Sequence, residues 1–521
     1  MAGVALASYL LTRGTVNDSE GYFMAGRSLS GTFIAGSLLL TNISAEQIIG
    51  LAGSAYAFNM SSMAWEVLSV LAIMIMAMVF LPRYLANGFT TLPQYLGERF
   101  SPLVRQATVT LFLLGYSLVT IPSVLYSGTI AVLQTFGTEL DGAHSFTIVM
   151  IVIGLIGMAY SVSGGLRAIA ISDTLNGAGL VFFGFLIPFL ALQQLGDGSV
   201  WSGWQSVTTV HPEKLNAIGS DTDPTPFVTL FTGMLFANLA YWGTNQYVIQ
   251  RSLAAKSLAA GQKGVMLAGF FKLLIPVFIM LPGVIAYHLY GDSLNSMDHA
   301  YPRLVSDVLP SFLTGIFLAV LLGAVFSSFN SLLQSSATLI TYDVYEPWLA
   351  TRGGQTVDDA TRIRIGRIAC VVITLSGLLV APSLQLAPEG LWQLIRKFTG
   401  FYNIPIIALV LGAMFLPRAS AKAAVAVVLF HVPAYAVITF WWDTGIHFIH
   451  WYAILFVIEM TILWAVRGPV YSGAETMASG AVSNKDDIDL TPWRYRWPMV
   501  GFLSLCVIGL YVFLSPLGVA S

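Results

Sequence analysis

Residues 41 to 47 read Thr-Asn-Ile-Ser-Ala-Glu-Gln, and they interrupt an otherwise apolar stretch from Phe33 to Phe58. That stretch is long enough to cross a bilayer at about 1.5 Å per helical residue. A polar cluster at its centre, with the carboxylate of Glu46, is costly in hydrocarbon unless protein or a water-filled cavity surrounds it. Broken helices at the membrane midplane commonly bind substrate and ions in secondary transporters. This segment therefore predicts both a membrane location and a binding site.

The composition predicts one integral membrane domain. Of the 521 residues, 56% are hydrophobic and 10% are charged, whereas average soluble proteins carry about 25% charged residues. Lipid is therefore expected around most of the chain, in the plasma membrane or, in a bacterium, the inner membrane. The net charge of −2 disfavours a nucleic-acid partner, and no obligate protein partner is evident. Cys370 and Cys506 lie in apolar runs, as packing residues do.

Apolar segments recur along the whole chain. Residues 1–12 are apolar but too short to span a bilayer, and we interpret them as the end of a leading helix. The spans expected after them are 30–58, 60–86, 104–137, 145–165, 170–196, 225–245, 263–289, 310–342, 363–385, 390–416, 421–441, 446–467 and 497–518.

The basic residues give this prediction an internal test, because Lys and Arg accumulate on the cytoplasmic side of membrane proteins. When the connections are assigned alternately to two sides, only Lys214 and Arg303 of the 24 basic residues fall on the second side. Lys272, Arg396 and Lys397 lie within or beside spans, and the others fall on the side of residues 13–29. The split supports the number of spans and places that first side in the cytoplasm.

A second interrupted span covers residues 225–245, and its middle reads Ala237-Asn238-Leu239-Ala240-Tyr241-Trp242-Gly243-Thr244-Asn245-Gln246. The two breaks fall in the first and sixth spans, a spacing that indicates two inverted five-helix repeats. An alternative is that Asn238 only bonds a neighbouring helix. We expect an all-α membrane protein with a leading helix and loop (1–29), two repeats (30–196 and 197–416) and three trailing helices (417–521). A polar cytoplasmic loop is expected near 470–490.

Further polar side chains lie inside predicted spans. Glu66 and Ser69 share one helix face, and Lys272 lies in the seventh span. Glu66 and Lys272 could pair and brace the bundle. With Asn42, Gln47 and Asn238 they could instead form a ring of donors and acceptors suited to a polyhydroxylated solute.

The eighth span contains Ala324-Val325-Phe326-Ser327-Ser328. Two adjacent hydroxyls, together with carbonyls freed by the first helix break, offer the hard oxygen ligands that suit Na⁺. Serines inside helices also commonly bond the carbonyl four residues earlier, which is the alternative for this pair.

Together these motifs resemble the solute:sodium symporter family, and most closely its sodium/glucose (galactose) branch. The similarity runs from about residue 21 to about residue 420. It rests on six stretches: residues 21–27, Asn42 to Gln47, Ser163-Gly164-Gly165-Leu166, Asn238 to Trp242, Asn245-Gln246-Tyr247-Val248-Ile249-Gln250-Arg251, and Ala324 to Ser328. The resemblance implies a LeuT-like five-plus-five inverted-repeat fold with discontinuous helices 1 and 6.

The resemblance also implies roles for individual residues. The family's sugar-binding positions correspond to Asn42, Gln47, Glu66, Ser69, Asn238 and Lys272. Tyr241 falls at the inner gate, where a tyrosine stacks on the sugar ring. The outer hydrophobic gate corresponds to Leu51, Trp65 and Trp392, with changed identities. The Na⁺ ligands correspond to the carbonyls of Leu40, Ile43 and Ala324 and to the hydroxyls of Ser327 and Ser328. Asp173 matches an aspartate on the cytoplasmic ion-exit route.

One position departs from the sugar branch. Where that branch commonly has a glutamine that contacts sugar, this chain has Arg396. A permanently charged, bidentate donor could bind a sugar hydroxyl, pair with Glu46 or Glu66, or favour an anionic substrate.

The expected function is Na⁺-coupled import of a sugar or related polyhydroxylated solute by alternating access. An anionic sugar, an organic acid or an amino acid is the alternative substrate. A membrane enzyme would need a catalytic constellation at a membrane face, and the sequence suggests none. A sensor built on a transporter fold would usually carry a signalling domain, so we expect a symporter and not an enzyme.

Overall fold

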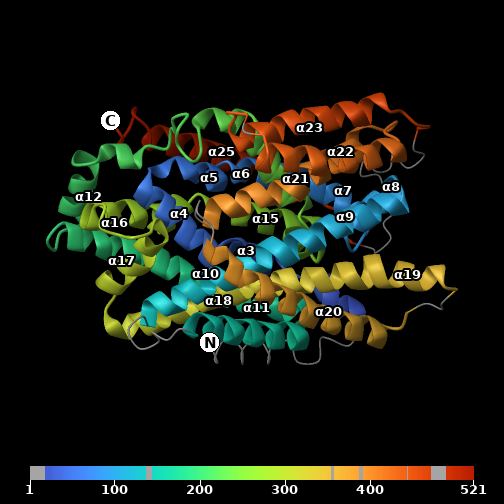
Figure 1. Cartoon of the computed structure of the whole chain (residues 1–521), viewed down its shortest axis with the longest axis horizontal. Coiled ribbons are helices and arrows are strands. Elements are labelled where there is room, and N and C mark those ends of the chain that lie inside the picture. The colour runs from blue at the N-terminus through green and yellow to red at the C-terminus, as the bar shows by residue number, and fades with distance from the viewer. Residues whose placement is uncertain (1–17, 137–143, 354–356, 387–390, 443, 471–487) are drawn as a thin grey trace.

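A computed structural model describes residues 18–136, 144–353, 357–386, 391–442, 444–470 and 488–521 (Figure 1). The expected leading helix at 1–12 and most of the loop at 470–490 lie outside the described residues. The α-helices are α2 (Ser19–Met24), α3 (Gly31–Asn42), α4 (Ala45–Ala57), α5 (Ala64–Val67), α6 (Ser69–Ile75), α7 (Leu81–Asn87), α8 (Leu92–Arg99), α9 (Pro102–Gly115), α10 (Ile121–Phe136), α11 (Ser145–Leu195), α12 (Val200–Thr209), α13 (Gly233–Thr244), α14 (Gln246–Leu253), α15 (Leu258–Lys272), α16 (Leu281–Tyr290), α17 (Ala300–Val308), α18 (Ser311–Leu339), α19 (Glu346–Thr351), α20 (Asp359–Val380), α21 (Leu391–Phe415), α22 (Ala421–Phe440), α23 (Phe448–Ala465) and α25 (Arg496–Phe513). Short 3₁₀ turns are η1 (Ala25–Arg27), η2 (Met60–Met63), η5 (Pro212–Leu215), η6 (Phe227–Phe231), η8 (Met297–His299) and η10 (Ala381–Leu386), and π-helical turns are η3 (Met76–Phe80), η4 (Tyr116–Thr120), η7 (Pro276–Met280) and η9 (Ile340–Tyr345).

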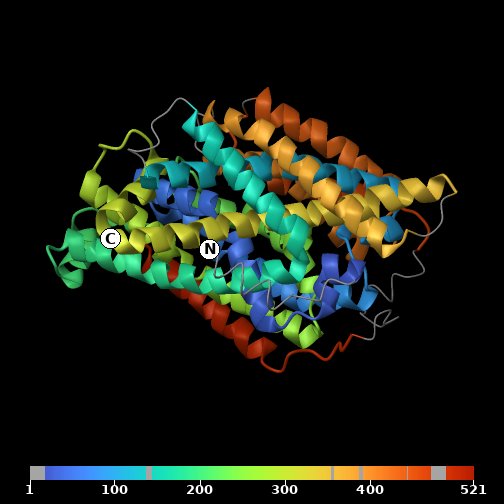
Figure 2. The same cartoon turned by 90° about the horizontal axis from the view of Figure 1, so that it is seen from below.

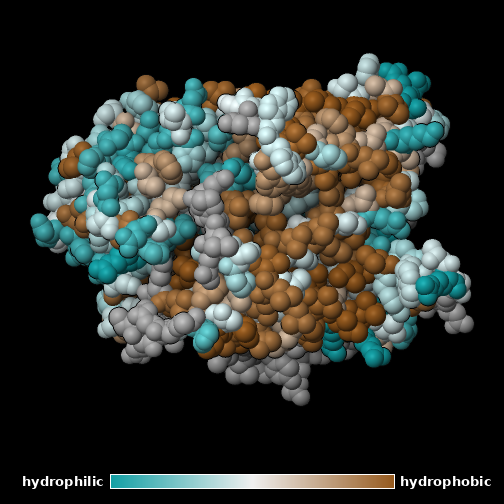
Figure 3. Space-filling model, viewed as in Figure 1, coloured by the Kyte–Doolittle hydropathy of each residue, from teal (hydrophilic) through white to brown (hydrophobic). Residues whose placement is uncertain are grey.

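The expected membrane spans are present in the structure. In the described part of the chain, 11 helices are long and apolar enough to cross a membrane, and the bent pair α3 and α4 makes a twelfth span. The shorter pair α13 and α14 occupies the place of the sixth expected span. Figure 3 shows hydrophobic residues over the middle of the molecule and hydrophilic residues toward its two ends, as a bilayer requires.

Two broken helices lie at equivalent places in the chain. Helices α3 and α4 meet at 60° around Ile43 and Ser44, whose backbones are extended. Helices α13 and α14 meet at Asn245, which is also extended. The half-helices α3 and α13 each contain 12 residues, and in both cases a π-helical turn, η3 or η7, interrupts the next span. These matched irregularities agree with two structural repeats.

The second break lies at the edge of the predicted polar stretch and not in its middle. Asn238 donates from Nδ2 to the Met234 carbonyl (3.1 Å), and Thr244 donates from Oγ1 to the Ala240 carbonyl (2.7 Å). Because both polar side chains bond carbonyls of their own helix, α13 remains regular as far as Thr244. A further break lies at Gly165 (φ 62°), which separates two spans within α11, close to the boundary expected between residues 145–165 and 170–196.

The two ends of the molecule differ in charge. Helices α12, α16 and α17 lie at one end of the long axis, and α8 and α19 lie at the other (Figures 1 and 2). We call the end with α12 and α17, which carries Lys214 and Arg303, the outer end, and the other, rich in arginine, the inner end. At the inner end, hydroxyl side chains cap helix starts: Thr91 caps α8, Ser101 caps α9 and Ser257 caps α15.

Lys214 caps the C-terminal end of α4, at the outer end of the first broken span. Its buried ammonium donates to the carbonyls of Tyr56 (2.8 Å) and Ala57 (3.2 Å) at the end of α4 and lies 3.7 Å from the centre of the Tyr287 ring. Burial lowers the pKa of this amine. The ammonium therefore satisfies carbonyls that the helix leaves without partners and complements the helix dipole.

The substitution Lys214→Met is expected to lower the stability of the folded protein by about 1–2 kcal/mol, because it removes a helix cap and a cation–π contact. Thermal unfolding of the purified protein in detergent measures this effect. Lys422→Met, at an exposed position of α22, is the matched control and should leave the midpoint unchanged. Equal midpoints for both variants would contradict a capping role for Lys214.

Candidate functional site

Glu66 is the centre of a buried polar network between the two broken spans. Its side chain, 1% exposed on α5, accepts from the Gln47 amide of α4 at Oε1 and from the Lys272 ammonium of α15 at Oε2. Lys272 also donates to Oδ1 of Asn42, and Asn42 donates from Nδ2 to the Tyr241 hydroxyl at 2.9 Å. The structure thus joins five of the predicted substrate-site residues through direct contacts.

The structure shows features of both alternatives for Glu66 and Lys272, the bracing pair and the polar ring. The two residues form an ion pair, with side chains 1% and 3% exposed. The pair is not isolated, because amides of both halves of the broken span bond it as well. A buried ion pair with further hydrogen bonds is stable without a ligand. A polar solute binding here would exchange its own hydroxyls for these internal hydrogen bonds.

Two other predicted residues lie near this network but are not joined to it by their side-chain polar atoms. Ser69 donates from Oγ to the backbone carbonyl of Glu66, so it contacts that residue but not its carboxylate. Asn238 bonds the carbonyl of Met234 in its own helix. Both side chains are buried.

Arg396 lies between two tryptophans. Its guanidinium carbon is 3.9 Å from the ring centre of Trp392 on α21 and 4.5 Å from that of Trp65 on α5. Both indoles are at least 95% buried, and Leu51 is fully buried. No direct ion pair joins Arg396 to Glu46 or Glu66 among the described residues, although the guanidinium interacts electrostatically with Glu46. Aromatic faces hold the cation instead.

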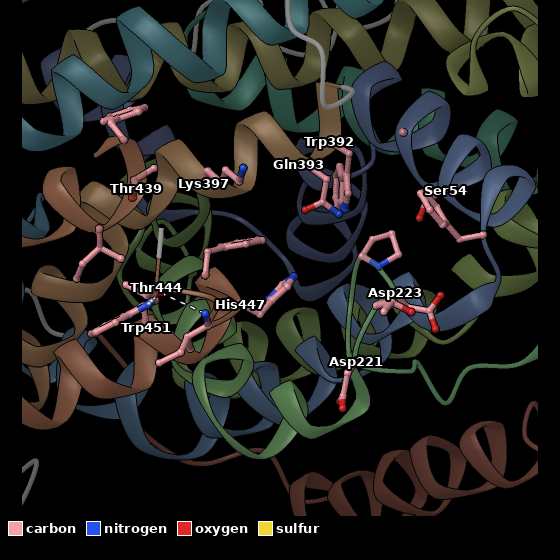
Figure 4. Close-up of a pocket in the computed structure, with 18 of the residues that line it drawn as sticks. Ser54, Asp221, Asp223, Trp392, Gln393, Lys397, Thr439, Thr444, His447 and Trp451 are labelled. Atoms are coloured by element: carbon pink, nitrogen blue, oxygen red, sulfur yellow. Dashed lines mark hydrogen bonds between the residues drawn. The ribbon is translucent and has the colours of Figure 1, made fainter. Parts of the chain in front are cut away.

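An open vestibule of about 650 Å³ lies at the outer end. Trp392 lines it as well as stacking on Arg396. Figure 4 shows Trp392, Gln393 and Lys397 of α21 on one wall and Asp221 and Asp223 on the loop opposite. The vestibule therefore reaches the tryptophan that stacks on Arg396.

The charges in the vestibule are mainly acidic. Asp221, Asp223 and Asp298 lie in its lining, against the single cation Lys397 among the described lining residues. Burial raises the pKa of Asp298. Burial lowers the pKa of His447 to about 4, so this imidazole is neutral at physiological pH. An acidic vestibule attracts cations and repels anions.

Ser328 on α18 contacts the first helix break directly. Its hydroxyl donates to the carbonyls of Leu40 (3.2 Å) and Thr41 (3.1 Å). The neighbouring Ser327 hydroxyl is buried and interacts with the carboxylate of Asp173. In the break, the backbone N–H of Gln47 donates to the Ser44 carbonyl and not to the carbonyl of Ile43, four residues earlier. The Ile43 carbonyl is therefore left outside the regular helical hydrogen bonds. Ala324 lies fully buried one turn before Ser328.

This oxygen set fits Na⁺ chemically. It supplies carbonyl and hydroxyl oxygens, the neutral hard ligands that a small monovalent cation prefers. The Ser327 hydroxyl lies buried beside Ser328 and next to Asp173, so its oxygen is shielded from bulk water. Leu40, Ile43, Ala324, Ser327 and Ser328 would hold the ion, and Thr41 is a carbonyl that the sequence did not indicate.

Asp173 belongs to a buried network that leads toward these serines. It accepts from the Ser37 hydroxyl (2.6 Å), which in turn accepts from Nε of Arg251 (3.0 Å). Arg251 also donates to Ser331, whose hydroxyl bonds the Ser327 carbonyl at 2.6 Å. Asp173 and Ser327 both line a cavity of about 440 Å³.

Sequence reasoning missed the place of Arg251. The prediction counted it among the basic residues of the cytoplasmic side, without a contact inside the protein, but the side chain is fully buried. The available signal was its position at the end of the polar run Asn245 to Arg251, directly after the second break. A buried guanidinium is stable here because Ser37, Ser331 and the Tyr247 carbonyl all accept its hydrogen bonds.

Comparison with known proteins decides the family. The family model described as "Sodium:solute symporter family" matches residues 22–430. The chain belongs to the sodium:solute symporter family. Members of this family are transporters and not enzymes, and Na⁺ is their coupling ion. The chain is therefore a multi-pass membrane symporter for Na⁺ and a solute, as predicted.

Two relatives show how far the similarity extends. "Uncharacterized symporter YidK" of Escherichia coli (strain K12) is 39% identical over 526 residues, covering 99% of this chain and 90% of the relative. "Sodium/glucose cotransporter" of Vibrio parahaemolyticus is 32% identical over 443 residues, covering 81% and 79%. The predicted resemblance to the sodium/glucose branch is confirmed by this similarity.

Solved structures support the fold. A Na⁺-coupled sialic acid symporter in a substrate-bound outward-open state is similar, with a TM-score of 0.76 at 19% identity, over 89% of this chain and 95% of that chain. A nucleobase-cation-symport-1 family transporter in a closed conformation gives a TM-score of 0.57 at 13% identity. The LeuT-like all-α fold predicted from the sequence is confirmed.

Proposed function

We propose that this symporter imports a neutral sugar, or a closely related polyhydroxylated solute, together with Na⁺, across the bacterial inner membrane. The observation that supports this most directly is the network around Glu66. It presents amide, ammonium, carboxylate and phenol groups, and sugar hydroxyls can accept from the ammonium, donate to the carboxylate, and do either with the amides and the phenol. The similarity to a sodium/glucose cotransporter supports the same substrate class.

In this proposal the two broken spans and their partners bind both ligands. The substrate accepts hydrogen bonds from Asn42, Gln47 and Lys272 and donates to Glu66. Ser69 and Asn238 lie beside these residues, and Tyr241 lies on the inner side. Na⁺ binds at Ser327 and Ser328 against the carbonyls of the first break. Because Asn42 follows those carbonyls directly, ion binding orders the break and orients Asn42 toward the substrate.

Alternating access then follows from two gates on opposite sides of the site. Leu51, Trp65, Arg396 and Trp392 close the outer side below the vestibule. Tyr241 closes the inner side, and Na⁺ leaves toward the inner end past Asp173. The moving units would be the repeats 30–196 and 197–416, with 417–521 outside them.

An anionic sugar is the second candidate substrate, and one observation favours it. Arg396 lies in the outer gate, and its Nε–H has no hydrogen-bond partner. The acidic vestibule opposes this candidate, because Asp221 and Asp223 would repel an anion before it reached the gate. The electrostatics of the entrance therefore favour a neutral sugar.

A competition panel distinguishes the two substrates. D-Glucose, D-galactose, D-glucuronate and D-galacturonate are tested as pairs that differ only by a carboxylate. We expect a neutral hexose to inhibit Na⁺-driven uptake at least tenfold more strongly than its uronate, in the wild type and in Arg396→Gln alike. Preference for a uronate that disappears in Arg396→Gln would establish the anionic substrate instead.

A further inference from the structure

The trailing helices contain a buried titratable pair that the transport mechanism does not use. His431 on α22 and Glu459 on α23 are both fully buried, and Nδ1 of His431 lies 2.5 Å from Oε1 of Glu459. The other ring nitrogen, Nε2, lies 3.1 Å from the backbone carbonyl of Gly400 on α21. Figure 1 shows α21, α22 and α23 packed side by side.

The contacts of the two ring nitrogens of His431 define how many protons His431 and Glu459 hold together. A carbonyl oxygen only accepts, so Nε2 must carry a hydrogen toward Gly400. Nδ1 and the Glu459 carboxyl must then share one further hydrogen between them. On the nitrogen it gives imidazolium and carboxylate, and on the oxygen it gives imidazole and carboxylic acid. The pair is neutral in both forms, which avoids an isolated charge inside the bundle.

Two tyrosines extend this contact along α21. Tyr435 of α22 donates to the carbonyl of Lys397 (2.8 Å), and Tyr452 of α23 donates to the carbonyl of Arg396 (2.5 Å). Gly400 makes the approach possible, because a Cβ atom there would lie only 2.6 Å from the Tyr435 hydroxyl and from the Tyr452 ring. Three side chains therefore bond three carbonyls of one helical turn, and Glu459 bonds one of the three, His431. We call these four residues the α21 clamp: His431, Tyr435, Tyr452 and Glu459.

That turn carries the outer gate. Arg396 lies on it, and its guanidinium stacks between Trp392, one turn earlier in α21, and Trp65. Pro405 lies just beyond it in the same helix, where the missing N–H weakens the helical ladder and permits bending. Hydrogen bonds that hold the carbonyls of residues 396–400 therefore also hold the side chains of Arg396 and Trp392 in place relative to Trp65.

We propose that His431 and Glu459 hold one shared proton as a neutral unit, and that this unit, with Tyr435 and Tyr452, positions Arg396 in the closed outer gate. The clamp residues contact neither ion nor substrate and act through α21 as positioning residues. The helices α22 and α23 thus set how readily the outer gate opens. This inference rests on the proposed gate but not on the identity of the sugar.

The rate at which a cysteine below the gate reacts with a thiol reagent tests the proposal. Ser69→Cys lies one turn deeper than Trp65 and is placed in a chain whose Cys370 and Cys506 are replaced by alanine. A membrane-impermeant thiol reagent is added to the outer side of vesicles in NaCl. His431→Ala and Glu459→Ala are expected to raise the labelling rate about five- to tenfold, as loss of a buried hydrogen bond predicts.

Conservative variants separate positioning from stability. Glu459→Gln keeps a hydrogen bond to His431 in a neutral pair, so it should label at the wild-type rate. Tyr452→Phe removes one hydroxyl and should accelerate labelling about threefold. This variant replaces His431→Ala in the test if His431→Ala does not fold. Tyr511→Phe, which removes a buried hydroxyl without a partner on α25, is the matched control and should match the wild type.

Two results would overturn the inference. Labelling that stays at the wild-type rate in His431→Ala and Tyr452→Phe, while the unfolding temperature falls, would mean a purely structural role. Labelling of Glu459→Gln as fast as that of Glu459→Ala would mean that the pair needs a charge and is not a neutral unit. Thiol labelling reports only the opening of the outer gate, so neither result bears on Na⁺-coupled transport.

Discussion

Replacement of Lys272 by methionine is expected to abolish transport and to destabilise the protein by about 3–5 kcal/mol. The reason is that Glu66, 1% exposed, would lose its counter-charge inside the bundle, and breaking a buried ion pair leaves an uncompensated charge. Asn42 would also lose the ammonium that holds its carbonyl. Thermal unfolding in detergent and Na⁺-driven uptake in proteoliposomes measure the two effects.

The double variant Glu66→Gln with Lys272→Met separates these effects. It removes both charges, so most of the lost stability should return. Transport should remain below about 1% of the wild type, because the solute loses its strongest donor and acceptor. A double variant that transports normally would show that the pair braces the bundle and does not bind the solute.

Ser328→Ala is the second change with a large expected effect. The hydroxyl bonds the carbonyls of Leu40 and Thr41, and Na⁺ would share the same oxygens. Loss of one ligand should raise the Na⁺ concentration for half-maximal uptake at least tenfold, about 1.4 kcal/mol of binding free energy. Uptake rates measured across a series of Na⁺ concentrations at constant ionic strength give this value.

A matched control lies on the same helix. Ser336→Ala removes a buried hydroxyl that has no hydrogen-bond partner, and it should leave the Na⁺ dependence unchanged. A similar shift in both variants would attribute the effect to packing of α18. No shift in Ser328→Ala would remove Ser328 from the ion site.

The fold was predictable because lipid enforces a simple rule. Every span must be apolar and helical, so hydropathy alone located the expected segments, and the basic residues confirmed their alternation. The first break was also predictable, since Asn42 to Gln47 is polar at the centre of a span. The second was placed too early, because Asn238 and Thr244 satisfy their polar groups on carbonyls of their own helix.

The binding site was predictable where the sequence places a charged residue inside an apolar span, because such residues are rare. Glu66 and Lys272 were identified as site residues because a charged side chain inside a span needs a partner. In the structure the two side chains pair with each other. The surroundings of Arg396 were not predictable, because its aromatic partner Trp65 is distant in the sequence. The burial of Arg251 was also not predictable, because its hydrogen-bond partners Ser37 and Ser331 lie on other helices, far away in the sequence.

Sugar accumulation in proteoliposomes that contain only this protein tests the central claim most directly. An inward Na⁺ gradient is combined with a K⁺-valinomycin potential of about 100 mV, which adds about 2.3 kcal/mol for each Na⁺ that enters. We predict that labelled D-glucose or D-galactose accumulates above its external concentration, and more strongly when the inside is negative. Uptake of these hexoses that only equilibrates, or that is equal when K⁺ replaces Na⁺, would contradict Na⁺-coupled sugar symport.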